Sequence, residues 1–154
     1  SGADSPATIS KVPQLFLNAI PVEGTVTWGT SQNLIMPKMI FDQDKNRYLT
    51  LDEMMGLERE YGPFKYLNEA LRIEDNTKED ILSAVKEMDA IVNGELVLSK
   101  KNERLQKVFW IKFKSNWIKY LSIFSQTSQK HCGVLNAKVS PSFLEKNEKH
   151  LGLN

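Results

Sequence analysis

Cysteine and long apolar runs are scarce in this chain of 154 residues. Its single cysteine, Cys132, excludes an internal disulfide framework and a zinc cluster built from cysteines. The two histidines, His131 and His150, lack a metal-ligand partner at a suitable spacing. No apolar run approaches the roughly 20 residues that a membrane-spanning helix needs, and no signal-peptide pattern is present. We therefore expect a cytoplasmic protein.

Charge is balanced in total but not along the chain. The sequence has 20 basic and 19 acidic residues, and its apolar and charged fractions exclude a wholly disordered chain. Residues 1–98 carry a net charge of −7, whereas residues 99–154 carry +8. This asymmetry predicts that the C-terminal part faces an anionic partner or packs against an acidic surface.

Capping signals predict about five helices. The expected starts are Ser5-Pro6, the capping box of Thr50 and Glu53 with a helix to about residue 60, Asn76 or Thr77, Ser99 with a helix to about residue 125, and Ser140-Pro141. In the helix that follows Thr77, we expect the apolar stripe of Ile81, Val85, Met88 and Val92 to face the core.

Strand signals are fewer than helix signals. Residues 25–28 are β-branched and aromatic, which predicts a strand. Residues 29–40 contain an apolar stretch that Pro37 breaks, which predicts extended or irregular structure. The spacing of Ile9, Val12 and Phe16 predicts a helix in the opening segment, with a kink or restart at Pro13. The expected fold class is α/β, mostly helical, with one or two short strands.

Residues 2–6 form the first candidate site. A loop of small residues that enters a helix presents free backbone N–H groups and the positive end of the helix dipole, which suits a phosphate or diphosphate. The candidate substrate-binding residues are Gly2, Ala3, Asp4 and Ser5. Gly2 would allow close approach of the backbone, and the Ser5 hydroxyl would add a donor. The alternative is an ordinary cap at Ser5 without a ligand.

Residues 42–53 match the ligand spacing of a calcium-binding loop. Arg47, however, occupies the position where the sharp turn of such a loop needs a glycine, and Pro37 falls within the helix that should precede it. We therefore interpret this segment as a polar turn followed by the capping box at Thr50, and we expect no metal.

Residues 99–125 combine basic and aromatic side chains in one predicted helix. One face carries Trp110, Phe113, Trp117, Tyr120, Leu121 and Phe124, and lysines are interleaved along the helix. The helix could belong to the core, with its lysines extending into solvent, or it could lie on an anionic membrane surface. No nucleic-acid partner is expected, because the chain as a whole is not basic and no recognised binding motif is present.

Four segments together resemble a poorly characterised bacterial family of glycosyltransferases with a GT-B-like architecture. The segments are residues 2–6 with the turn at 18–22, residues 35–40 with 46–50, residues 74–81 with Glu87 and Met88, and residues 140–147. Their order and spacing carry the resemblance, which covers most of the chain and is weakest over residues 95–130.

The resemblance implies transfer of a sugar from a nucleotide-sugar donor in the synthesis of bacterial surface glycans. Residues 1–48 would belong to a Rossmann-like donor-binding domain, and residues 49–154 would form a helical C-terminal extension. The chain would then be the C-terminal part of a longer protein. The N-terminal domain of such an enzyme normally supplies the catalytic base, so catalytic residues stay unassigned and this part alone is not expected to be active.

The resemblance also bears on ligands and location. GT-B transferases generally need no metal to bind the donor, so the expected ligand is the nucleotide sugar and no cofactor is expected. Residues 99–125 would allow a peripheral position at the inner face of a membrane. The alternative interpretation is a non-catalytic helical module that docks to a membrane or to a protein through the same residues.

Overall fold

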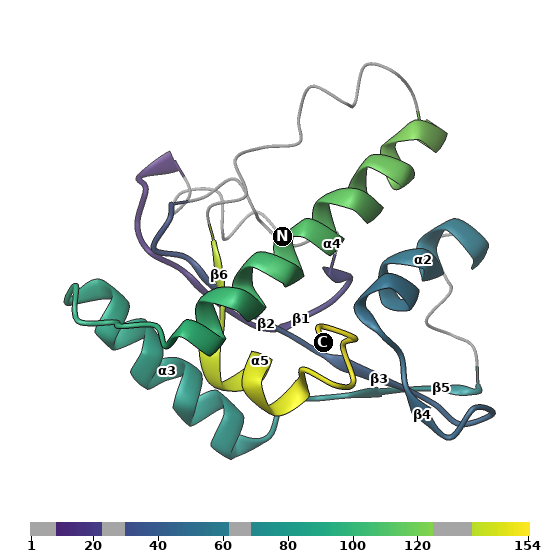
Figure 1. Ribbon diagram of the computed structural model, residues 1–154, viewed down its shortest axis with the longest axis horizontal. Helices are drawn as coiled ribbons and strands as arrows, with labels where there is room; N and C mark the ends of the chain where they lie inside the picture. The colour runs from purple at the N-terminus through teal and green to yellow at the C-terminus, as the bar shows by residue number, and fades with distance from the viewer. Residues whose placement is uncertain (1–8, 23–29, 62–68, 125–136) are drawn as a thin grey trace.

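Two small sheets organise the protein in the computed structural model (Figure 1). The structure describes residues 9–22, 30–61, 69–124 and 137–154. For residues 58–61 and 120–124 it describes the backbone alone. One sheet is parallel and has the order β1 (Leu15–Ala19), β2 (Leu34–Pro37), β6 (Lys138–Val139). The other is antiparallel and has the order β4 (Arg47–Tyr48), β3 (Met39–Asp42), β5 (Leu71–Glu74). The α/β class is therefore confirmed. The expectation of one or two strands is wrong, because the described residues contain six.

Four helices pack around these sheets within the described residues: α2 (Leu51–Tyr61), α3 (Lys78–Val92), α4 (Lys100–Phe124) and α5 (Pro141–Asn147). Figure 1 shows α4 crossing the molecule diagonally, with α2 beside its C-terminal half. Helices α3 and α5 lie next to each other and cover the ends of the parallel strands. Each sheet takes strands from both sides of residue 48, because β5 and β6 complete sheets that earlier strands begin.

The predicted caps of all four helices are confirmed. The hydroxyls of Thr50, Thr77, Ser99 and Ser140 each accept a hydrogen bond from the backbone N–H three residues later. In α2 and α3 the box is reciprocal, because a carboxylate in the first turn accepts a hydrogen bond from the backbone N–H of the cap. Each cap thus satisfies N–H groups that the helix itself cannot reach.

Residues 34–42 form two nearly continuous strands, where extended or irregular structure was expected. Strand β2 lies between β1 and β6, and the side chains of Leu34 and Met36 are fully buried. A short, continuously apolar run is typical of a strand covered on both faces. Pro37 is tolerated because it ends β2, and the N–H of Lys38 donates to the carbonyl of Ala19 in β1 instead.

The opening segment also differs from its prediction, because residues 15–19 form β1 rather than a helix. The backbone is helical at Ile9 but reverses at Lys11, where φ is +55°. Residue 12 precedes Pro13, a position that disfavours helical backbone. Three apolar residues at helical spacing were too short a pattern to compete with pairing to β2. The predictions for Ser5-Pro6 and for residues 25–28 lie outside the described residues.

One hydrophobic core joins both sheets to α2, α3, α4 and α5. Helix α3 buries Ala84 and Ile91 in it, whereas Val85 and Val92 are 46% and 53% exposed. Of the expected stripe, Ile81 and Met88 pack against this core, so the prediction is confirmed at these two positions and wrong at Val85 and Val92. The apolar spacing was compatible with two adjacent faces, and only the neighbouring strands and α5 determine which one is covered.

Candidate functional site

The carboxyl ends of the parallel strands are tied together by Asn76. The Asn18 N–H donates to Asn76 Oδ1 at 2.9 Å, and the Asn76 N–H donates to Asn18 Oδ1 at 2.7 Å. The Asn76 side-chain amide also donates to the carbonyl of Pro37 at 2.8 Å. One residue between β5 and α3 therefore holds the ends of β1 and β2, and it sets the geometry of the surface around them.

A pocket of about 210 Å³ lies beside Asn76. Its apolar lining is Met39 and Phe143, and its polar lining is Tyr48, Glu74, Asp75, Asn76, Thr77, Asp80, Lys146, Asn147 and His150. Met39 follows β2 and the α5 residues follow β6, so the pocket lies where the parallel strands end. Open α/β sheets bind ligands in this position. The volume is below the roughly 300–1,000 Å³ of sites for whole drug-sized ligands, so it suits one part of a larger ligand.

Glu74 accepts three hydrogen bonds at the pocket. The Tyr48 hydroxyl donates to its Oε2 at 2.6 Å, and the Arg72 guanidinium donates twice to its Oε1, at 3.0 and 2.6 Å. The hydrogen bond from Tyr48, assisted by Arg72, holds the pKa of Glu74 below its usual value, and the same bond raises the pKa of Tyr48. The rings of His150 and Tyr48 meet edge to face, with ring centres 4.7 Å apart. Glu74 is therefore ionised, and the aromatic rings of Tyr48 and His150 line the pocket beside it.

Asp80 joins α3 to α5 on another side of the pocket. The Lys146 ammonium donates to both of its carboxylate oxygens at 2.8 Å, and the Thr77 hydroxyl donates at 2.8 Å. Burial opposes ionisation of Asp80, but these hydrogen bonds outweigh it and keep its pKa below the usual value. Three carboxylates and one lysine line the pocket. Because this balance disfavours an anionic ligand, the arrangement suits hydroxyl groups, which donate hydrogen bonds to carboxylates.

Several residues that carry the family resemblance have structural roles in this fold. Asn76 ties the strand ends, and Thr77 caps α3. Glu87, from the middle of α3, accepts hydrogen bonds from the Ser140 hydroxyl at 2.6 Å and from the Ser142 N–H at 2.8 Å. It thereby caps the first turn of α5 from outside. These motif positions are explained by the packing of α3 against the strand ends and α5.

The residues predicted as substrate-binding, Gly2, Ala3, Asp4 and Ser5, lie outside the described residues. The pocket residues Tyr48, Glu74, Lys146 and His150 were not singled out as a site from the sequence. They come from three separate segments, with Lys146 and His150 in the last one, so no local spacing could bring all four together. The available signal was indirect, since the first three fall within segments that carry the family resemblance. His150, which had no partner in the sequence, finds one in Tyr48.

The calcium-like segment is a hairpin followed by a helix cap. The Asp42 carboxylate accepts the Lys45 N–H at 3.0 Å and pairs with its ammonium at 3.1 Å. Glu53 forms two hydrogen bonds with the Arg47 guanidinium, at 2.8 and 2.6 Å. Asn46 takes the positive φ that closes the hairpin between β3 and β4. Within the described residues, no three His, Cys, Asp or Glu side chains are grouped to hold a metal ion.

The ion pair of Glu53 predicts an acid-sensitive contribution to stability. The hydrogen bond from Arg47 lowers the Glu53 pKa from 4.5 to about 2, and hydrogen bonds from Thr50 add to this effect. Burial of Glu53 acts in the opposite direction but is outweighed. Between these values the unfolded chain binds more protons than the folded one, so the stabilisation is complete above pH 4.5 and is lost as the pH falls toward 2. We expect Glu53→Gln to lower the melting temperature near pH 7 and to flatten its dependence on pH in that window. Circular dichroism melts between pH 2 and 7 measure this, and an unchanged slope in the variant would contradict the assignment.

No protein-family model, curated protein or solved structure matches the chain. Among the helices that the structure describes, none has both the length and the apolar character needed to cross a membrane. The functional interpretation therefore depends on the geometry of the pocket and on the resemblance in the sequence.

Proposed function

We propose that this chain is the donor-binding part of a nucleotide-sugar-dependent glycosyltransferase of bacterial surface-glycan synthesis. The observation that carries the proposal is the position of the polar pocket, outside the carboxyl ends of β2 and β6 and beside the residue that ties β1 to β2. A parallel sheet with a ligand at this edge is the arrangement of a Rossmann-like donor domain. The parallel order β1–β2–β6 supports this finer assignment to a GT-B donor domain.

The chemistry of the pocket supports a sugar as the part of the donor that it holds. Ionised Glu74 accepts hydrogen bonds from hydroxyl groups, and the amides of Asn76 and Asn147 are placed along the same lining. The rings of Tyr48 and His150 offer an apolar edge for the carbon–hydrogen face of a sugar ring. The small volume fits one ring better than a complete nucleotide sugar.

The diphosphate of the donor is assigned to Gly2, Ala3, Asp4 and Ser5. Backbone N–H groups of this loop would neutralise the leaving diphosphate as its charge develops. The catalytic base is assigned to an N-terminal domain of the same protein, so none of the residues of this chain is given a catalytic role. The donor itself is the substrate, and the proposal needs no metal or other cofactor.

A non-catalytic interaction module is the second candidate. The observation that favours it is the long helix α4, whose outer side carries several exposed lysines. Such a module would have no reason to bind nucleotide sugars, so a binding experiment separates the two candidates.

We expect calorimetric titration of the chain with UDP-glucose, UDP-N-acetylglucosamine and GDP-mannose to show binding of at least one of them. Glu74→Gln should weaken that binding about tenfold, because hydrogen bonds to a charged group contribute about 1.5–3 kcal/mol. Binding of the corresponding free nucleotide should change little, because the pocket is assigned to the sugar.

Glu79→Gln is the matched control, since Glu79 is an exposed carboxylate in the first turn of α3 that does not line the pocket. Both variants are first checked for wild-type melting. Absence of binding to all three nucleotide sugars, or equal effects of the two variants, would contradict the proposed function.

A further inference from the structure

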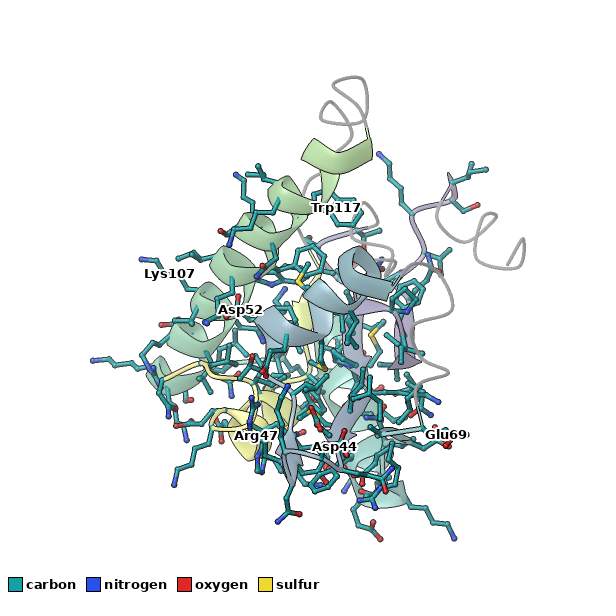
Figure 2. The ribbon with its side chains drawn as sticks, turned by 90° about the vertical axis from the view of Figure 1, so that its right-hand side faces the viewer. Asp44, Arg47, Asp52, Glu69, Lys107 and Trp117 are labelled. Carbon is teal, nitrogen blue, oxygen red and sulfur yellow. The ribbon has the colours of Figure 1, made fainter. Side chains whose placement is uncertain are left out.

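The outer side of α4 carries a continuous stripe of basic and aliphatic residues, which we call the basic face. Its members are exposed and recur every three or four residues: Lys100, Arg104, Lys107, Ile111, Lys114 and Ile118. The side chains of Ile111 and Ile118 are 58% and 51% exposed. In Figure 2, Lys107 points away from the rest of the molecule, on the side of α4 opposite to Trp117.

The lysines of the basic face are not neutralised by the part of the protein that the structure describes. Lys100, Lys107 and Lys114 form no ion pair with any described residue. The other lysines of α4 behave differently: Lys101 pairs with Glu148 at 2.7 Å, and Lys112 pairs with Asp52 at 2.5 Å. The helix therefore uses Lys101 and Lys112 to hold its neighbours and presents Lys100, Lys107 and Lys114 to the outside.

The aromatic side chains that the structure describes on α4 are turned to the opposite side. Phe109 and Phe113 are buried, and Trp110 and Trp117 pack against the core. These rings are thus not available to stack on nucleic-acid bases, which is how single strands gain most of their non-ionic affinity. The apolar groups that do accompany the lysines are aliphatic, and they suit the boundary between lipid headgroups and acyl chains.

We propose that the basic face docks the protein on an anionic lipid bilayer, with α4 lying along its surface. Charge complementarity carries the proposal, because three lysines that pair with no described residue surround two exposed isoleucines on one side of a helix of 25 residues. The lysines meet anionic headgroups, and Ile111 and Ile118 enter the interface between them. This surface lies on a different element from the polar pocket, so the inference does not depend on the proposed donor binding.

Co-sedimentation with vesicles tests this inference directly. We expect the chain to bind vesicles of equal parts phosphatidylcholine and phosphatidylglycerol at about 0.1 M salt, and to be released at about 1 M salt, where charges are screened within about 3 Å. Vesicles of phosphatidylcholine alone should bind far less. A lysine close to an anionic surface contributes roughly a fivefold factor to partitioning, so Lys107→Gln with Lys114→Gln should reduce binding about 25-fold.

The matched control is Lys86→Gln with Lys149→Gln, which removes the same charge from exposed positions outside α4 and should retain most of the binding. Ile111→Ser with Ile118→Ser should weaken binding several-fold and leave its dependence on salt. Equal binding to neutral and anionic vesicles, equal loss in the lysine pair and its control, or binding to single-stranded DNA without binding to vesicles would each overturn the inference. Nucleotide-sugar affinity should be unchanged in the α4 variants, so the two proposals fail separately.

Discussion

Phe109→Ala is expected to lower the free energy of unfolding by about 3–5 kcal/mol. Phe109 is 1% exposed in the core, and its ring contacts those of Trp110 and Phe113, with ring centres 5.2 and 6.3 Å away. The substitution removes this contact and leaves a cavity that the neighbouring rings cannot fill. Because a domain of this size is stable by only about 5–15 kcal/mol, urea denaturation should show a large fall in the midpoint.

Ile111→Ala provides the comparison within the same helix. Its side chain points outward, so the free energy of unfolding should change by no more than about 0.5 kcal/mol. Similar losses in the two variants would show that α4 is oriented differently from the structure. The pair also matters for the membrane inference, which requires Ile111 on the outside.

Asn76→Ala is expected to destabilise the protein by about 2–4 kcal/mol, although no apolar core is lost. The substitution removes the acceptor of the Asn18 N–H and the donor to the Pro37 carbonyl. A partly buried backbone group left without a partner costs about 1–3 kcal/mol, and two are affected here. Denaturant titration measures the loss, and a loss near zero would contradict the role of Asn76 in tying the strand ends.

Asn76→Asp separates the two hydrogen bonds. An aspartate still accepts from the Asn18 N–H but cannot donate to the Pro37 carbonyl, so its effect should be intermediate. Asn18 takes a positive φ of 51°, which asparagine adopts more readily than most residues, so most other side chains would be strained at position 18. Since Asn76 lines the pocket, its loss should also change the shape of the proposed sugar site.

Predictions from the sequence succeeded where the signal was local. Each helix cap accepts a hydrogen bond from a backbone N–H only three residues later, as seen for the hydroxyls of Thr50, Thr77, Ser99 and Ser140. The start of each described helix could therefore be recognised before any tertiary contact was known. The face of α4 was also largely correct, since Phe113 is buried and Lys107 is exposed. Phe109, which is buried more deeply than Trp110 or Trp117, was missed because it adjoins the expected aromatic face.

The sequence by itself determined the helix starts, the α/β class and the uneven distribution of charge, because capping, periodicity and composition act within a few residues. Only the tertiary structure decided that residues 15–19 and 34–42 are strands. Strand β2 is stabilised by pairing with β1 and with β6. Lys138 of β6 pairs with Leu34 of β2, although the two residues lie about a hundred positions apart in the chain. The pocket is tertiary for the same reason, because Tyr48, Glu74, Lys146 and His150 become neighbours only after both sheets and α5 have assembled.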